Sequence, residues 1–244
     1  MIDFKEKEQY TYEDLLQLVR VLRQPDGCPW DSTQDHHSIR RCFLEEVSEA
    51  CEAIDQEDPA HLQEELGDVL YQVVFHADLE REAGRFGMDE VIDGICKKLV
   101  ARHPFLFQPE DPALDASMAL NRWEERKQQL NGYQTVTESM ESVCRTLPAL
   151  WRAEKLRKKA AKAGYGPQDR EQAAAVLQQR HDALQQALRD GCDPTQALGE
   201  MLFAAADLSA HIPADPEAAL HAACETYIRR FSAAEEAGFD TAGH

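Results

Sequence analysis

The stretch FLEEVSEACEAIDQEDPAHLQEELGDVLYQVV, residues 43–74, decides the fold of this chain. Its apolar residues recur every three or four positions on both sides of Asp58-Pro59, which is the spacing of one buried helix face. Because a proline disfavours helical backbone in the residue before it, Asp58-Pro59 separates two helices. The connection between them is short, so we expect the two helices to be antiparallel neighbours.

The same helical rhythm extends over most of the 244 residues. Glycine and proline are sparse, and alanine, leucine, glutamate and glutamine are abundant, which favours helices. We therefore predict an all-α fold. Further helices are expected from Thr11 to Gln24, from Met88 to His103, from Ala116 to Leu130 and, as a basic helix, at 150–166, whereas 25–32 and 103–115 are expected to be loops.

Composition and charge exclude several classes of protein. The net charge of -19, without a stripe of lysines or arginines, argues against a nucleic-acid partner. A small anionic ligand could share a site with carboxylates only across a divalent cation. The seven cysteines contain no C-x-x-C pair, which excludes a zinc ribbon and indicates a reducing compartment. The start, MIDFKEKEQY, lacks the apolar core of a signal peptide, and no apolar run approaches ~18 residues, so we expect a cytoplasmic protein without membrane contact.

The chain contains an internal repeat. ELGDVLYQVV at 65–74 reappears as ALGEMLFAAA at 197–206, and EEVSEACEAI at 45–54 aligns with QQRHDALQQA at 178–187. This predicts a first domain at 1–132, a connector at 133–148 and a second domain at 149–244. The second copy keeps the apolar positions and changes the charged ones: Gln178, Gln179 and Asp182 replace Glu45, Glu46 and Glu49, and Ala197 and Glu200 replace Glu65 and Asp68.

Two pairs of carboxylates flank the apolar stripes of the first copy. Glu46 with Glu49, and Glu65 with Asp68, are three residues apart, so each pair projects to one side of its helix. Packing the two helices by their stripes can bring all four together. Such a set repels itself unless a cation neutralises it, and its hard oxygen ligands suit Mg²⁺, with Mn²⁺ as a substitute. The alternative is a solvated helix face whose charges drifted in the second copy. The loss of these carboxylates from a copy that kept its apolar core favours a specific task for them in the first copy.

These motifs resemble the E-E-x-x-E and E-x-x-D motifs of MazG-type nucleoside triphosphate pyrophosphohydrolases. The resemblance covers most of the chain and extends to further segments in the order found in two-domain MazG proteins: GCPWD at 27–31, KKLVARHPFLF at 97–107, NRWEERK at 121–127 and SVCRTLPALWRAEKLRKKA at 142–160.

The resemblance implies an all-α fold of duplicated antiparallel helical-bundle modules, a homodimer, and Mg²⁺-dependent hydrolysis of nucleoside triphosphates to monophosphate and pyrophosphate by attack of water at the α-phosphorus. It also implies a role for each matching residue. Glu46, Glu49, Glu65 and Asp68 fall on the metal ligands, Glu45 on a position that orients or deprotonates the attacking water, Lys98, Arg102 and Lys127 on phosphate contacts, and Trp123 on a base-stacking position. Glu45 and Glu46 are the predicted catalytic residues.

The second copy departs from the family pattern. It lacks the acidic quartet, Thr226 stands where the family has a lysine, and the sequence stops at His244, before the tryptophan and lysine segment of a second nucleotide site. We therefore expect activity in the first copy and a packing and dimer-forming role for the second.

Two other classes of function compete with this interpretation. A carboxylate-bridged di-iron bundle needs two E-x-x-H pairs, and the sequence contains none. A non-catalytic helical protein that binds nucleotide or metal, or mediates interactions, would bind nucleotide with metal and release no pyrophosphate.

Overall fold

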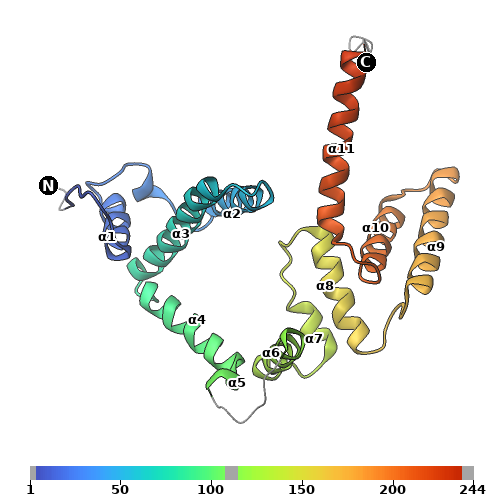
Figure 1. Ribbon diagram of the computed structural model, residues 1–244, viewed down its shortest axis with the longest axis horizontal. Helices are drawn as coiled ribbons and strands as arrows, with labels where there is room; N and C mark the ends of the chain where they lie inside the picture. The colour runs from blue at the N-terminus through green and yellow to red at the C-terminus, as the bar shows by residue number, and fades with distance from the viewer. Residues whose placement is uncertain (1–3, 108–114, 238–244) are drawn as a thin grey trace. The chain divides into compact units, whose positions relative to one another are not determined.

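The computed structural model describes residues 4–107 and 115–237, and within these ranges every regular element is helical (Figure 1). The predicted all-α fold is confirmed. The chain divides into two compact units, Met1–Arg126 and Lys127–His244. The division falls inside helix α6, Ala116–Asn131, so this helix contributes residues to both units. None of the helices in the described ranges has the length and apolar character needed to cross a lipid bilayer.

Helix α1, Tyr12–Arg23, begins and ends where the sequence predicts. The Thr11 side chain accepts a hydrogen bond from the backbone N–H of Asp14, and the Asp14 carboxylate accepts one from the N–H of Thr11. This reciprocal pair satisfies two backbone donors that the first turn of a helix leaves unpaired. After α1, the predicted loop contains one short 3-10 helix, η1, Asp31–Thr33.

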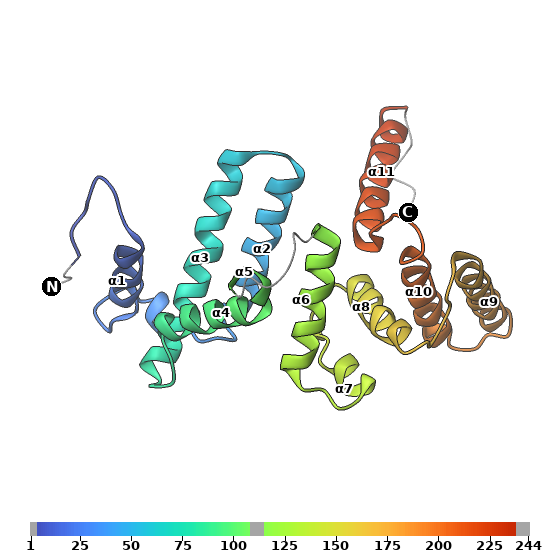
Figure 2. The same cartoon turned by 60° about the horizontal axis from the view of Figure 1, so that its bottom comes forward.

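Helices α2, Arg40–Asp55, and α3, Pro59–Glu82, form the predicted antiparallel hairpin. Figure 2 shows the two helices side by side along most of their length. The Asp58 carboxylate accepts hydrogen bonds from the backbone N–H groups of Ala60 and His61, which caps α3 at its start. Pro59 thus prevents α2 from continuing and also begins α3. The first turn of a helix does not use the backbone N–H that proline lacks.

The core of the first unit lies between α1 and α3. Val19, Ile39, Val74 and Phe75 are almost fully buried and pack into one cluster. Val74 follows Glu65 by two and a half helical turns, so the two residues project to opposite sides of α3. Burial of the Val74 side against α1 therefore leaves the Glu65 side of α3 for α2.

The segment after α3 contains helix α4, Met88–Arg102, and the four-residue helix α5, Pro104–Phe107. The sequence predicted a loop over 103–115, and for 104–107 this prediction is wrong. A proline at the first position of a helix already has the required backbone angle, so Pro104 starts a turn of helix. Residues 108–114 lie outside the described ranges. Figure 1 shows α4 starting near the end of α3 and diverging from the α2–α3 hairpin.

The second unit repeats the hairpin. Helices α9 and α10 pack side by side as α2 and α3 do, and the aligned segments 178–187 and 197–206 fall on them. Helix α8 packs on α10, where buried Arg157 and Asp207 form an ion pair. The expected connector contains one short helix, α7. The bounds are Val136–Glu141 for α7, Ala149–Lys162 for α8, Arg170–Arg189 for α9, Thr195–Ser209 for α10 and Pro216–Glu236 for α11.

Candidate metal centre

Three of the predicted ligands converge on the α2–α3 hairpin. Glu46 and Glu49 from α2 and Glu65 from α3 each offer a carboxylate oxygen, and these oxygens all lie within 4.8 Å of one another. Over residues 4–107 and 115–237, no other group of three or more histidine, cysteine or acidic side chains is so close. Glu46 and Glu49 are one turn apart on α2. Because α2 packs against α3, they lie close to Glu65 on the facing helix.

The electrostatics of this set favour a cation. Burial raises the pKa of the Glu46 carboxyl, and the charges of Asp68, Glu49 and Glu65 raise it further. Glu65 is only 7% exposed, so little water screens its charge. Asp68 is not part of the 4.8 Å set, although its charge acts on Glu46. Oxygen donors that repel one another in a half-buried site are the donor set that a hard divalent cation needs, so these residues fit a metal such as Mg²⁺.

His61 is a neighbour of the set that sequence reasoning missed. Its Nε2 lies 3.0 Å from Oε1 of Glu65, one helical turn further along α3. The ring nitrogens of His61 are not among the atoms that lie within 4.8 Å of one another, so this side chain contacts a ligand without joining the set. The i, i+4 spacing of the histidine and the glutamate was the available signal.

Glu45 lies outside the carboxylate set. Its Oε1 is 2.7 Å from Nε of Arg41, and both side chains are largely exposed. The Arg41 partner orients Glu45 along the outer surface of α2. The role of this residue towards the attacking water stays a prediction.

The predicted phosphate and base contacts lie on other helices. Lys98 and Arg102 are on α4, and Trp123 is on α6. The guanidinium carbon of Arg102 lies 5.3 Å from the centre of the Trp123 ring, and Nε of Arg126 donates to the carbonyl of Ala101 at 3.3 Å. The structure therefore joins Arg102 to Trp123. It does not bring Lys98 or Arg102 into hydrogen-bond contact with the carboxylate set among the described residues, and their roles stay predictions.

A second group of polar side chains lies further along the hairpin. His36 Nδ1 is 2.8 Å from His76 Nδ1, and His36 Nε2 is 2.6 Å from Oε1 of Glu80. Burial and the neighbouring His36 lower the pKa of His76, whereas Arg85 and then His36 lower the pKa of Glu80 to about 2. Sequence reasoning missed this group because its two histidines are far apart in the chain. It borders a cavity of about 540 Å³ that is lined by apolar side chains and by histidine and charged side chains in equal number.

In the second unit, the residues at the matching positions form hydrogen bonds and ion pairs with neighbouring side chains. Gln178 donates from Nε2 to Oδ1 of Asp182 at 2.8 Å, and Arg180 Nη1 lies 2.9 Å from Oε2 of Glu200. Gln196 donates to the other oxygen of Glu200 at 3.0 Å. The two carboxylates that remain in this copy therefore have neighbours that neutralise or bind them.

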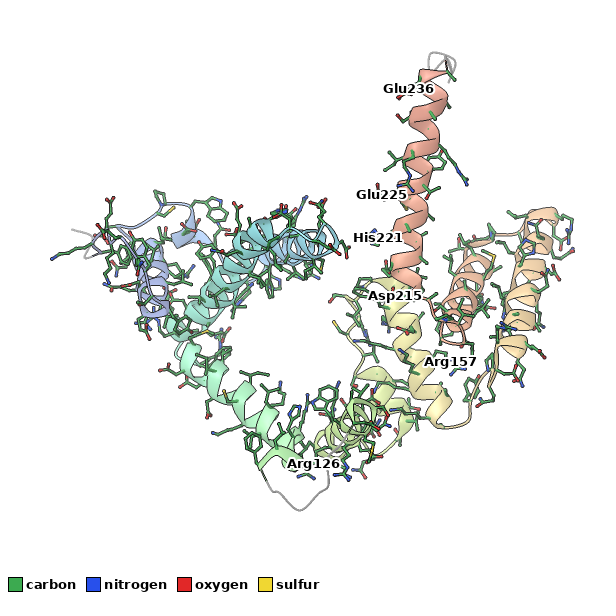
Figure 3. All side chains as sticks on the ribbon, in the orientation of Figure 1. Arg126, Arg157, Asp215, His221, Glu225 and Glu236 are labelled. Atoms are coloured by element: carbon green, nitrogen blue, oxygen red, sulfur yellow. The ribbon has the colours of Figure 1, made fainter. Side chains whose placement is uncertain are left out.

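Helix α11 of the second unit is anchored at its start. The indole N–H of Trp151 on α8 donates to Oδ2 of Asp215 at 2.9 Å, just before α11 begins. From there, Figure 3 shows α11 extending past His221 and Glu225 to Glu236 without another helix of its unit alongside. Tyr227 and Ile228 are 72% and 58% exposed on this part of the helix.

Comparisons with known proteins agree with this geometry. Residues 34–107, which include the whole hairpin, match the model of the MazG nucleotide pyrophosphohydrolase domain. The chain is 34% identical over 225 residues to the nucleoside triphosphate pyrophosphohydrolase/pyrophosphatase MazG of Thermotoga maritima, and the match covers 92% of this chain and 86% of that protein.

A second curated relative bears on the same point. A nucleoside triphosphate pyrophosphohydrolase of Escherichia coli K12 is 36% identical over 227 residues, which covers 91% of this chain and 86% of that protein. A crystal structure of a mazG-related protein from Thermotoga maritima aligns with 48% of this chain and 98% of its own, at 30% identity and a TM-score of 0.40. On its similarity to these full-length relatives, with the acidic hairpin inside the matched domain, the chain belongs to the MazG family of nucleoside triphosphate pyrophosphohydrolases.

Proposed function

We propose that the first unit hydrolyses nucleoside triphosphates to nucleoside monophosphate and pyrophosphate, by attack of water at the α-phosphorus, with Mg²⁺ held by Glu46, Glu49, Glu65 and Asp68. The observation that carries this proposal is the convergence of carboxylate oxygens from α2 and α3 within 4.8 Å, together with the raised pKa of Glu46. The names of the two full-length relatives support the reaction.

The side chains of this site divide into ligands and supports. In this proposal Glu46, Glu49 and Glu65 hold the cation from two helices, and Asp68 is the fourth ligand, from the next turn of α3. Mg²⁺ bound there would supply charge neutralisation for the phosphates and a lowered pKa for a bound water. Lys98, Arg102 and Lys127 remain the predicted phosphate contacts, and they would stabilise the negative charge that builds up on the leaving pyrophosphate.

We further propose that the protein is a homodimer. Apolar side chains on α2 and α3 stay about half exposed beside the acidic set, among them Leu44, Val47 and Leu66. Tyr227 and Ile228 of α11 are exposed in the same way. A soluble chain with several such helix faces gains by burying them, and a second copy of the same chain supplies complementary faces by symmetry.

The decisive experiment incubates the protein with each nucleoside triphosphate and Mg²⁺ and assays pyrophosphate and monophosphate. We expect both products from the wild type and a loss of about 100-fold or more in Glu46→Gln and Asp68→Asn, because one ligand and its charge are removed. Metal-dependent nucleotide binding without pyrophosphate release would replace the catalytic proposal with the non-catalytic one. Full activity of both variants would show that other carboxylates hold the metal.

The assignment of activity to the first unit has a matched control. Glu200 stands at the position of Asp68 in the second copy, and its carboxylate is already paired with Arg180. Glu200→Ala should therefore leave turnover unchanged, with circular dichroism to verify the fold. A loss of activity in a folded Glu200→Ala variant would contradict this assignment.

A further inference from the structure

His61 is the basic side chain that contacts Glu65, the most deeply buried of the proposed metal ligands. Its Nε2 lies 3.0 Å from Oε1 of Glu65, and among the described residues no other basic side chain forms an ion pair with that carboxylate. Glu65 is only 7% exposed, so water solvates it poorly. A buried carboxylate is stable only when a cation or an N–H donor replaces the lost water. His61 supplies one such donor.

The contact engages one of the two oxygens of Glu65. A carboxylate oxygen offers only lone pairs, so a ring nitrogen 3.0 Å away must carry a hydrogen. With one oxygen held by His61, the other oxygen of Glu65 remains for a different partner. A contact of this kind restricts the carboxylate to one orientation, which is what the neighbours of metal ligands commonly do in metalloproteins.

The first turn of α3 places His61 at this distance. Residues four apart on a helix are neighbours on its surface, so His61 and Glu65 lie on the same face of α3, one turn apart. The Asp58 carboxylate, which caps the helix, accepts a hydrogen bond at 3.1 Å from the backbone N–H of His61 itself. The backbone of His61 is therefore held in a capped helical turn, and its side chain starts from a fixed position.

The second copy of the hairpin lacks this turn. Helix α3 begins six residues before Glu65, whereas α10 begins only two residues before the matching Ala197. The position that matches His61 is Asp193, which precedes α10 and accepts a hydrogen bond at 2.9 Å from the backbone N–H of Thr195. The second hairpin thus packs without the additional turn. Of the two copies, the one with the acidic set is also the one with the longer helix and the histidine.

We propose that His61 is a positioning residue of the metal site: its Nε2–H holds one oxygen of Glu65, so that the other oxygen is directed at Glu46 and Glu49 and binds the cation. This inference rests on the proposed function, because it takes the acidic set to hold Mg²⁺. His61 itself is not a ligand, since its ring nitrogens lie outside the set of atoms within 4.8 Å of one another. The competing interpretation is an i, i+4 pair that only stabilises the helix. The two interpretations predict different metal affinities.

The test measures the Kd of Mn²⁺ by electron paramagnetic resonance, without nucleotide. His61→Ala should raise this Kd about 10- to 100-fold, which is the usual effect of losing such a neighbour of a ligand. His61→Leu, which keeps much of the bulk of the ring without its nitrogens, should do the same. His61→Gln should recover most of the affinity, because its amide N–H can reach a carboxylate four residues away. A folded His61→Leu variant with the Kd of the wild type would overturn the proposal.

A matched control and a double-mutant cycle show whether His61 acts through Glu65. Gln63 is exposed on the same turn of α3 and projects to the opposite side, so Gln63→Ala should bind Mn²⁺ as the wild type does. In a Glu65→Ala background, His61→Ala should change the remaining Kd by less than about twofold, because the group that it positions is gone. Independent, additive effects of the two substitutions would overturn the proposal.

Turnover distinguishes a positioning residue from a catalytic one. At limiting Mg²⁺, His61→Ala should hydrolyse nucleoside triphosphates about 10- to 100-fold more slowly than the wild type, because fewer sites hold metal. At saturating Mg²⁺ its kcat should return to within a few-fold of the wild type, whereas Glu46→Gln, which lacks a ligand, should stay slow. A loss of kcat in His61→Ala that persists at saturating Mg²⁺ would overturn a role confined to positioning.

Failure of this inference and failure of the proposed function give different results. Equal Mn²⁺ binding by the wild type and Glu46→Gln would place the metal elsewhere and refute both. Metal binding without pyrophosphate release would refute only the catalytic function, and a weaker Kd in His61→Ala would still uphold the role of His61. Mg²⁺-dependent turnover by the wild type, with an unchanged Kd in His61→Ala and His61→Leu, would refute this inference alone.

Discussion

At the scale of single residues, the proposed metal centre consists of charges that oppose folding as long as no cation is bound. The raised pKa of Glu46 has burial as its first cause and the neighbouring carboxylates as its second. The folded state therefore binds this proton more tightly than the unfolded chain. Without metal, the raised pKa means that stability falls as the pH rises through the folded pKa of Glu46.

Removing that charge should weaken the stabilisation of the fold by metal. At neutral pH without metal, Glu46→Gln should melt at a higher temperature than the wild type, because the buried repulsion is gone. With Mg²⁺ at about 100 times its dissociation constant the wild type should gain about 2.7 kcal/mol, and Glu46→Gln should gain much less. Thermal unfolding with and without Mg²⁺ measures both effects. An equal gain in both proteins would place the cation elsewhere.

Glu80 gives a pH dependence of the opposite sign. Arg85, and after it His36, lower the pKa of Glu80 to about 2, below its usual value of 4.5. The ionised carboxylate therefore stabilises the fold above about pH 4.5, and this contribution is lost as the pH falls towards 2. Glu80→Gln should melt below the wild type at pH 7, and the difference should narrow over that window. A difference that stays constant from pH 7 to pH 2.5 would contradict the role of the Glu80 charge.

At the scale of elements, we infer that the hairpin was duplicated and that the two copies then diverged in their charged positions. In α2 and α3 the carboxylates converge, whereas in α9 and α10 the matching positions hold Gln179 and Ala197. Both hairpins keep their packing between the two helices. The proposed metal site would therefore depend on a few side chains at the border of the apolar stripe, and the packing of the two helices does not require them.

Restoring those side chains should restore metal binding. The double variant Gln179→Glu, Ala197→Glu adds two carboxylates to Asp182 and Glu200, which recreates the pattern of the first copy. The amount of Mn²⁺ bound per chain, followed by electron paramagnetic resonance, should rise above that of the wild type. Gln185→Glu, an equal kind of charge change on the same helix, should bind no additional Mn²⁺. Unchanged binding in the double variant would mean that the α9–α10 geometry no longer supports a site.

The helix boundaries show which element ends the sequence predicts correctly and which it does not. The capping box at Thr11 and the Asp58-Pro59 break are local signals, and the helices start next to them as predicted. At Pro104 the same kind of signal was read as a loop, although a proline also suits the first position of a helix. A proline marks a possible boundary between elements. The packing of the surrounding chain decides whether a helix starts at the proline or a loop continues through it.

At the scale of the whole molecule, helix faces remain uncovered in each unit. The exposed part of α11 carries large apolar side chains, with Tyr227 and Ile228 the clearest cases. A full apolar side chain is worth about 1.5–3 kcal/mol when it is buried. Exposed apolar helix faces of this kind support the proposed homodimer despite the high net charge of the chain.

This surface predicts the effect of one charge on assembly. Ile228→Asp should raise the dissociation constant of the dimer about tenfold or more, because an apolar contact is replaced by a buried charge. Light scattering coupled to size exclusion measures the mass at micromolar concentrations. Tyr165→Asp changes a side chain that is 77% exposed in the loop after α8 and should leave the mass unchanged. A wild type that is monomeric at these concentrations would refute the dimer.

The sequence by itself determined the helices, their pairing in two hairpins and the four carboxylates, because periodicity, caps and i, i+3 spacing are properties of neighbours along the chain. Only the tertiary structure decided which of these groups meet. It brings Glu46, Glu49 and Glu65 together, turns Glu45 to Arg41 and pairs His36 with His76. These contacts depend on the packing of helices that are distant in sequence, and no local pattern records which side chain faces which across that distance.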